Sequence, residues 1–399
     1  MRTIMLATGI ECSYPTTNNG AHRVDELELT RHYQCWQEDL YLTQQLGIHY
    51  LRYGIPYHKV NPAREVYDWS FIDAVMYKMR ELNIEPIIDL CHFGMPDWLG
   101  NSFQNPEFPY AFMDYACTFA RRYPWVRFYT PINEIFVCAK FSALFGWWNE
   151  QLASDDAFIK AICHMAKGSL LAQNEILKFQ QEAIFVQSES TEFTHSIGKN
   201  ANARAEWENQ IRFLGLDLLY GNQVRADVYA WLLQHGVNRD DYTWFMNQYH
   251  YDCVVGTDYY VTNERILDDE GRVFHVGEVF GWYLLTMDYY ERYHKPLMHT
   301  ETNIREEENA VAWLWKQWQN ILRMRAKGIP VMGFTWYSLV DQVDWDTALR
   351  EANGRVHSVG LYDMNRQPRP VGLAYKKLIE EFNWLPIVHN SDFLGITNH

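Results

Sequence analysis

The sequence predicts an α/β protein, a (β/α)8 TIM barrel, and three observations support this fold class. Eight apolar runs of strand length alternate with longer stretches of helical periodicity. The chain has 399 residues, 48% of them hydrophobic, which is enough to bury one large core. No linker, repeat or low-complexity tract divides it. We therefore expect a single barrel domain over residues 1–399.

The expected strands follow one another along the whole chain. They are Ile4–Gly9, Tyr50–Gly54, Glu85–His92, Phe128–Asn133, Ala183–Gln187, Cys253–Tyr260, Pro296–Glu301 and Val331–Trp336. Apolar residues recur at helical spacing between them, for example over 71–82 and 311–322, as in crossover helices of a parallel barrel. The segment 188–252, between strands five and six, is longer than one crossover requires. We expect inserted helices there, near 204–219 and 223–235, over or beside the barrel mouth.

Two glutamates stand where such a barrel carries its active site. Glu134 follows the fourth expected strand in Thr-Pro-Ile-Asn-Glu, and Glu301 closes the seventh in His-Thr-Glu. The carboxyl ends of the strands meet at one face of the barrel, so both side chains are expected to face one site. Paired carboxyl groups are what the hydrolysis of a glycosidic bond requires. Further carboxylates near strand ends, Asp89, Glu189 and Glu192, are interpreted as structural or loop-surface groups.

Charge and cysteine content exclude several classes of partner. A formal net charge of -15, without a local basic cluster, argues against nucleic acid and anionic membrane surfaces. Seven scattered cysteines, without a Cys-x-x-Cys pair, favour reduced core residues in the cytoplasm over a disulfide framework or a zinc site. The amino terminus has no export pattern, and no apolar stretch is long enough for membrane insertion. The oligomeric state is left open.

At the level of motifs the chain resembles glycoside hydrolase family 1, the β-glucosidase-like branch of the retaining (β/α)8 glycosidases. Thr130–Glu134 resembles the family's T-x-N-E-P, and Thr300–Asn303 resembles T-E-N-G, with Thr302 inserted. Four further stretches are similar to family motifs after strands two, three and eight: Leu51–Pro56, His92–Leu99, Tyr337–Trp345 and Val359–Asp363. Several motifs are altered, so the resemblance is to a divergent member.

The resemblance implies a role for each matching residue. Glu134 would be the general acid/base and Glu301 the nucleophile of a retaining hydrolysis, with the two carboxyl groups about 5–5.5 Å apart. Arg52 would hold Glu301 ionised. The strand-six tyrosine that supports the nucleophile would be Tyr259 or Tyr260. Adjacent strand residues point to opposite faces, so only one of them can face the site, and Tyr260 is favoured.

Sugar binding is expected from hydroxyl-binding side chains and aromatic faces. By position, the expected substrate-binding residues are Glu11, His92, Asn133, Tyr259, Trp336, Tyr337, Asp344 and Trp345. Either Trp336 or Tyr337 would form the sugar platform, and Trp147 and Trp148 could form a platform for the leaving group, or aglycone. Glu11 stands where the family has glutamine, and Asp344 where it has glutamate. These replacements point to a sugar other than plain glucose.

Other functions were weighed against the same residues. No His-x-His, His-Glu-x-x-His or glycine-rich phosphate loop is present, so neither a metal nor another cofactor is expected. Transglycosylation shares the first half of the glycosidase reaction and stays open as an alternative. A non-catalytic carbohydrate-binding protein on a glycosidase scaffold is the second alternative, although binding alone requires neither glutamate. The expected partner is a carbohydrate or glycoside.

Overall fold

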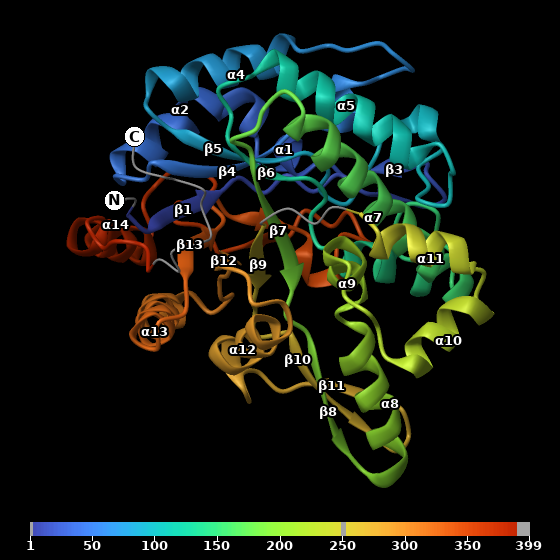
Figure 1. Cartoon of the computed structure of the whole chain (residues 1–399). Helices are drawn as coiled ribbons and strands as arrows, with labels where there is room; N and C mark the ends of the chain where they lie inside the picture. The colour runs from blue at the N-terminus through green and yellow to red at the C-terminus, as the bar shows by residue number, and fades with distance from the viewer. Residues whose placement is uncertain (1–2, 249–252, 389–399) are drawn as a thin grey trace.

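The computed structural model describes residues 3–248 and 253–388, and its centre is a closed barrel of eight parallel strands (Figure 1). The strands are β1 (Met5–Gly9), β4 (Tyr50–Gly54), β5 (Glu85–Asp89), β6 (Phe128–Thr130), β7 (Ile184–Ser190), β9 (Val254–Asp258), β12 (Leu297–Glu301) and β13 (Val331–Tyr337). Their hydrogen-bonded order is β1-β13-β12-β9-β7-β6-β5-β4. The predicted (β/α)8 barrel and its eight strands are thus confirmed. Residues 1–2, 249–252 and 389–399 of the predicted domain lie outside the described residues.

Alternation along the strands explains why the barrel is apolar at one end and polar at the other. An apolar cluster contains residues of seven barrel strands: Met5, Ala7, Ile87, Phe128, Val186, Val254, Met298 and Met332. On the same face of each strand, Asp89 and Ser188 come two positions after Ile87 and Val186, and Asp258 comes four positions after Val254. All three are buried. The carboxyl ends of the strands therefore carry polar side chains that the apolar end lacks.

Strands β7 and β6 end at other residues than predicted. β7 continues past the predicted Gln187 to Ser190, because its polar residues Ser188 and Glu189 pair with Gly256 and Thr257 of β9 at the polar end. Conversely, β6 ends at Thr130 instead of Asn133. Residues 131–134 leave the sheet and carry Asn133 and Glu134 into the loop above it.

Helices surround the barrel in the order expected of βα units. The longer ones that pack around it are α2 (His32–Gln45), α4 (Ser70–Glu81), α5 (Phe108–Arg122), α7 (Asp155–Leu177), α12 (Gly281–Tyr293), α13 (Glu307–Ala326) and α14 (Pro370–Phe382). Shorter helices are α1 (Glu26–Leu29), α3 (Tyr57–Val60) and α6 (Ile135–Ala139). In α4 the buried side chains recur at helical spacing, as predicted. α13 has acidic residues in its first turn and arginines in its last, which complements the helix dipole.

The predicted insertion between the fifth and sixth barrel strands is confirmed, with more parts than expected. It contains α8 (Lys199–Ile211), α9 (Leu214–Tyr220), α10 (Ala226–Gln234) and α11 (Arg239–Met246). A single helix was predicted over 204–219, but the chain breaks at Arg212. The side chain of Arg212 is buried there and donates to the Glu192 carbonyl at 2.7 Å and to Asp288 at 2.5 Å.

A small sheet that was not predicted extends from the same end of the barrel. β8 (Phe193–Ile197) pairs in parallel with β10 (Glu264–Asp268), and β10 pairs antiparallel with β11 (Val273–His275). Figure 1 shows this sheet and α8 projecting away from the barrel, next to the ends of β7 and β9. Two-residue strands complete the structure: β2 (Thr16–Thr17), β3 (His22–Arg23), β14 (Gln342–Val343) and β15 (Val356–His357). In the part of the chain that is described, no helix is both long and apolar enough to cross a membrane.

Candidate active site

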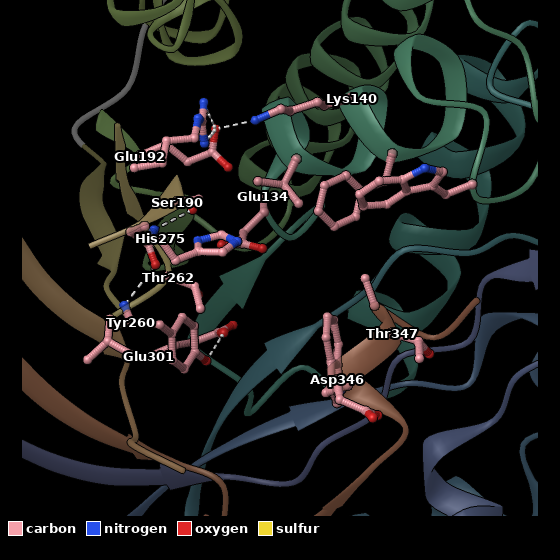
Figure 2. A pocket seen from close by; sticks show the side chains of 18 of the residues that line it. Glu134, Lys140, Ser190, Glu192, Tyr260, Thr262, His275, Glu301, Asp346 and Thr347 are labelled. Atoms are coloured by element: carbon pink, nitrogen blue, oxygen red, sulfur yellow. Dashed lines mark hydrogen bonds and ion pairs between the residues drawn. The ribbon is translucent and has the colours of Figure 1, made fainter. Parts of the chain in front are cut away.

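A cavity of about 980 Å³ opens at the carboxyl ends of the strands, near the upper end of the range for ligand pockets. Residues at or just after several strand ends line it, among them Glu11, His92, Glu134, Tyr260 and Glu301. Figure 2 shows Glu134, Tyr260 and Glu301 around the same space. The fold therefore brings the two predicted glutamates, 167 positions apart by their numbers, to one cavity.

Glu301 ends β12, and both of its carboxyl oxygens accept hydrogen bonds. Oε1 accepts from Nη1 of Arg52, and Oε2 accepts from the hydroxyl of Tyr260 at 2.7 Å. Arg52 is 2% exposed and also donates to Asp89 at 3.0 Å and to the amide oxygen of Asn133. A buried guanidinium and a hydroxyl donor stabilise negative charge on the Glu301 carboxylate.

Glu134 has different surroundings in the same cavity. It precedes α6 with a left-handed backbone (φ 42°), and its amide donates to the Ser188 carbonyl at 3.1 Å. Among the described residues, no side chain or amide donates a hydrogen bond to its carboxyl group. Burial, followed by the charges of Asp258, Glu301 and Glu189, raises the pKa of Glu134 well above its ordinary value. The geometry therefore favours a protonated Glu134 beside a charged Glu301.

Asp258 is a buried carboxyl group of this site that the sequence analysis missed. It lies opposite Glu301 in the β9–β12 register and accepts from the Ser188 hydroxyl at 2.5 Å. Ser188 thus contacts both Asp258 and the backbone of Glu134. Burial and the charge of Glu301 raise the pKa of Asp258. Its place could have been read from the sequence, because it shares a strand face with Tyr260.

His92 and Asn133 lie side by side next to the Arg52 side chain. The Nδ1 atom of His92 is 2.7 Å from Asp89, and its Nε2 atom is 3.2 Å from the Asn133 amide nitrogen. His92 lines the cavity, whereas Asn133 is fully covered behind it. Glu11 also lines the cavity and is held by the Ser13 amide at 3.0 Å, the Ser13 hydroxyl at 2.5 Å and the Gln342 amide at 3.2 Å. These contacts fix the polar groups that face a ligand.

Cys12, Asp89 and His92 are close enough to be considered as metal ligands. One ligand atom of each lies within 4.8 Å of the others, and all three are buried. The same Asp89 oxygen, however, already accepts hydrogen bonds from Arg52 and His92. A cation there would lie beside the buried Arg52 guanidinium on the same carboxylate, and this like charge disfavours a metal.

Comparison with known proteins shows which family the chain is similar to. Residues 12–206 match the sequence profile of glycosyl hydrolase family 1. The chain is a divergent relative of this family. A protein from Oryza sativa subsp. japonica named "Probable inactive beta-glucosidase 14" is 20% identical over 211 residues, which are 51% of this chain and 41% of that protein. The chain thus spans about two fifths of the length of that curated relative.

Solved structures of family 1 show the same fold over almost the whole chain. The family 1 β-glucosidase from Thermotoga maritima has a TM-score of 0.79 and 16% identity, over 96% of this chain and 98% of that chain. Its complex with cyclophellitol gives the same TM-score and identity, over 96% and 99% of the two chains. The family resemblance predicted from the motifs is confirmed, and the low identity agrees with a divergent relative.

Several residues matched by position to family 1 motifs do not reach the cavity. Tyr259 points to the opposite face from Tyr260, and its hydroxyl donates to Glu264 at 2.8 Å. Trp148 is fully buried and donates to the Ala348 carbonyl at 2.8 Å, whereas its neighbour Trp147 lines the cavity. Alternation along the strand direction explains the two tyrosines. Trp148 lies in a loop, where its contact with Ala348 holds it away from the cavity.

The predicted sugar platform at the end of β13 is also displaced. Trp336 is fully buried, and its ring nitrogen donates to the Val359 carbonyl at 2.9 Å. Tyr337 lies under the cavity, with its ring parallel to His92 at 6.3 Å and the Arg52 guanidinium 5.7 Å from its ring centre. Neither residue lines the cavity.

Of Asp344 and Trp345, the last two residues of the motif Tyr337–Trp345, only one faces the cavity. Trp345 lines it. The Asp344 carboxylate accepts instead from the Arg355 amide at 2.7 Å, which turns it away from the cavity.

The mouth of the cavity contains residues outside the family 1 motifs. Glu192 pairs with Lys140 at 2.5 Å and with Arg265 at 3.2 Å, and Arg265 also lies 3.6 Å from Glu208. We call these four residues the ion-pair network. It joins the turn after α6, the loop before β8, strand β10 and helix α8. The sequence analysis interpreted Glu192 as a structural or surface group; it is a paired group that also lines the cavity.

Proposed function

We propose that the protein is a retaining β-glycosidase that cleaves a β-linked glycoside by double displacement. Glu301 attacks the anomeric carbon while Glu134 gives its proton to the leaving oxygen, and the C–O bond to the leaving group breaks. Glu134 then removes a proton from water, whose oxygen displaces Glu301 from the covalent glycosyl-enzyme. Two inversions at one carbon leave the product with the β configuration.

The contrast between the two glutamates carries this proposal. A nucleophile has to be ionised, and Glu301 accepts hydrogen bonds from Arg52 and Tyr260. A general acid has to be protonated, and Glu134 is buried without a donor and has a raised pKa. Two carboxyl groups whose environments differ in this way in one cavity are the arrangement that acid and nucleophile require. Membership of the surrounding sequence in the family 1 group supports the same reaction.

The other residues of the cavity have supporting roles in this proposal. His92 and Asn133 would bind sugar hydroxyls, with Asn133 entering when a ligand moves the side chains that cover it. Glu11 is an acceptor-only carboxylate, so it would bind a hydroxyl or amine that donates, and a sugar other than plain glucose would suit it. Trp345 supplies an aromatic surface, and Trp147 a platform for the leaving group.

Replacement of the nucleophile tests the proposal directly. We expect Glu301→Gly to lower kcat by more than about 10⁴-fold, because the covalent intermediate cannot form. Azide or formate should restore part of the turnover by occupying the space of the lost carboxylate, and the adduct should have the α configuration. The matched control is Glu192→Gln, a glutamate that lines the same cavity but is paired. Full activity of Glu301→Gly on an unactivated glycoside contradicts the proposal.

The substrate is found by a panel of aryl β-glycosides, followed by natural glycans and by nucleotide- and lipid-linked sugars. Release of free sugar identifies hydrolysis, whereas transfer of the sugar to an added alcohol in preference to water identifies transglycosylation. The panel gives the sugar, and the same compounds serve for all variants.

A second candidate function is carbohydrate binding without turnover. The printed name of the rice relative, which calls that protein inactive, is the observation that favours it. Calorimetric binding of a glycoside without any product, together with an unchanged affinity in Glu301→Gly, would support this candidate over hydrolysis.

We further propose that residues 1–399 act as one domain in the cytoplasm. All seven cysteines are free in the described structure, which suits a reducing compartment. The expected partner is a glycoside, and the acidic net charge of -15 disfavours nucleic acid.

A further inference from the structure

The two sides of the cavity mouth differ in how their basic side chains are paired. On the side of the inserted sheet, Lys140, Arg204 and Arg265 each have a carboxylate partner, Glu192 or Glu208. Figure 2 shows Lys140 and Glu192 on this side, with Asp346 and Thr347 across the cavity from them. Across the cavity, Arg305 and Arg350 line the mouth, and neither has an ion-pair partner within the described residues.

Both unpaired arginines are fixed to one short turn. Arg305 donates from Nη2 to the Trp345 carbonyl at 2.9 Å, and Arg350 donates from Nε to the Thr347 carbonyl at 2.7 Å. Trp345 and Thr347 are the first and last residues of a single 3-10 turn, Trp345–Thr347. The turn therefore holds two guanidinium groups at the same part of the mouth, while their remaining N–H groups stay available.

The carboxylate of the turn itself forms no ion pair with either arginine. Asp346, in the middle of the turn, accepts from Arg355 at 2.9 Å and lies 3.2 Å from His357, so both of its oxygens are occupied. Glu306 also lines the mouth, but it forms no ion pair with either arginine in the part of the chain that is described. The guanidinium groups are thus oriented before a ligand binds, which reduces the entropy lost on binding.

Contact with Trp147 places the pair on the side of the leaving group. The Arg350 guanidinium lies 4.3 Å from the centre of a Trp147 ring. Trp147 follows Glu134 in the segment after β6, and Glu134 is the group that gives its proton to the leaving oxygen in the proposed reaction. A group attached to that oxygen would extend from Glu134 toward Trp147 and the two arginines.

We propose that Arg305 and Arg350 form a binding site for an oxyanion, a carboxylate or phosphate, on the leaving group of the glycoside. Guanidinium groups suit such anions because their N–H groups match the spacing of two oxygens. In a chain with a net charge of -15, a fixed pair of cations gives an anionic leaving group a favoured place at the mouth of the cavity. This proposal depends on the proposed function in one respect: the arginines lie on the side of the leaving group only if Glu134 protonates the leaving oxygen.

A matched pair of substrates tests the proposal. The probes are 3-carboxyphenyl and 3-carbamoylphenyl β-glycosides of the sugar that the panel identifies; the two differ by one charge at almost equal size. We expect the wild-type protein to prefer the carboxylate by about 10-fold or more in kcat/KM, a preference that salt reduces. A third probe, with a phosphate ester at the same position, shows which oxyanion is preferred.

Variants show whether the arginines cause the preference. Arg305→Ala/Arg350→Ala should bring the ratio of the two kcat/KM values to about one and leave the carbamoyl substrate nearly unchanged. Arg350→Lys keeps the charge but loses the paired N–H groups, and it should give an intermediate ratio. Arg204→Ala is the control, because Arg204 lines the same mouth but is paired with Glu208. A wild-type ratio near one, or a ratio that the double variant leaves unchanged, overturns the proposal.

Binding experiments separate this site from the proposed reaction. If no substrate is turned over, calorimetry with 3-carboxyphenyl and 3-carbamoylphenyl β-D-glucoside still measures the preference. Tighter binding of the carboxylate that the double variant abolishes supports the arginine site although hydrolysis has failed. Equal binding, or no binding of either compound, overturns it. A preference only for 4-nitrophenyl β-D-glucoside 6-phosphate over its unphosphorylated form would also overturn it, since the anion would then be on the sugar.

Discussion

Glu134, which is buried, and Glu192, whose side chain is 12% exposed, line one cavity, yet their pKa values move in opposite directions. Burial raises both. For Glu134 the neighbouring charges of Asp258, Glu301 and Glu189 add to this effect. For Glu192 the charges of Arg265 and Lys140 overcome it and lower the pKa to about 2. The sign of the nearest partner, more than burial, decides which glutamate keeps its proton at neutral pH.

The deep end of the cavity, around Glu134 and Glu301, and the mouth of the cavity, around Glu192, therefore have different roles. At the deep end, buried carboxyl groups outnumber the cations that face them, an arrangement that costs stability and provides acid chemistry. At the mouth, the ion-pair network balances its charges and joins the inserted sheet to the barrel. Variants at the two places should therefore change different measured quantities.

Of the two glutamates compared, replacement of the acid should have the larger effect on catalysis. We expect Glu134→Ala to lower kcat/KM by about 10²–10⁴-fold for glycosides with poor leaving groups, and to spare substrates whose leaving group needs no proton. Steady-state kinetics over a series of aryl glycosides measures the dependence on leaving-group pKa. Equal losses for good and poor leaving groups would show that Glu134 does not donate the proton.

Replacement of Glu192 should change stability more than chemistry. Its pKa is lowered from 4.5 to about 2 in the folded protein, which corresponds to about 3 kcal/mol of stability. This contribution is present above pH 4.5 and is lost as the pH falls toward 2, because the unfolded state then binds the proton first.

The measurement is urea unfolding of the wild-type protein and Glu192→Gln at several pH values. The difference in free energy of unfolding should be largest near neutral pH and should shrink in acid. Glu175→Gln is the control, because its pair with Lys178 is exposed and should contribute less than about 1 kcal/mol. A constant difference between pH 7 and pH 3 would contradict the lowered pKa.

The adjacent residues Tyr259 and Tyr260 allow a sharper test of the contacts around Glu301. Tyr260→Phe removes the 2.7 Å hydrogen bond to Glu301 and should lower kcat/KM by about 10- to 100-fold, since hydrogen bonds to charged groups are the stronger ones. Tyr259→Phe, whose hydroxyl contacts Glu264 instead, should change it little. Equal effects of the two variants would contradict the geometry of the site.

The smallest expected change is a shift in pH dependence. In the proposed reaction Glu134 acts as an acid, so kcat/KM should fall as the pH rises through its raised pKa. Asp258→Asn removes the neighbouring charge that most raises this pKa after burial, and the alkaline limb should move to lower pH. Because the buried carboxyl groups titrate together, the alkaline limb of the pH profile gives an apparent pKa of all of them and not of Glu134 alone. A pH profile identical to that of the wild type would show that Asp258 carries no charge there.

The barrel could be predicted because its physical causes are local. Each strand is a short apolar run, and the position of Glu301 at the end of one of them was enough to place it at the cavity. Side-chain direction was predictable only where alternation applies, as for Tyr260. It was not predictable in loops: Trp148 and Asp344 turn away because of contacts with Ala348 and Arg355, which are distant along the chain or lie beyond a turn.

The inserted sheet could not be predicted from its strand pattern. β11 has only three residues and β8 only five, and β8 pairs with a strand that lies about 70 residues later, Glu264 opposite Phe193. One local indication existed, the Asp-Asp-Glu-Gly turn between β10 and β11, which is typical of a hairpin. Without this sheet, the partners of Lys140 and Glu192 at the mouth could not be identified.

The ion-pair network has a mechanical consequence for how a substrate is admitted. Lys140 belongs to the segment that carries the acid, whereas Arg265 and Glu208 belong to the projecting sheet and to α8. To widen the entrance, these segments would have to separate charged groups that water reaches poorly. The network therefore opposes widening of the entrance on this side, which limits the width of a molecule that can pass.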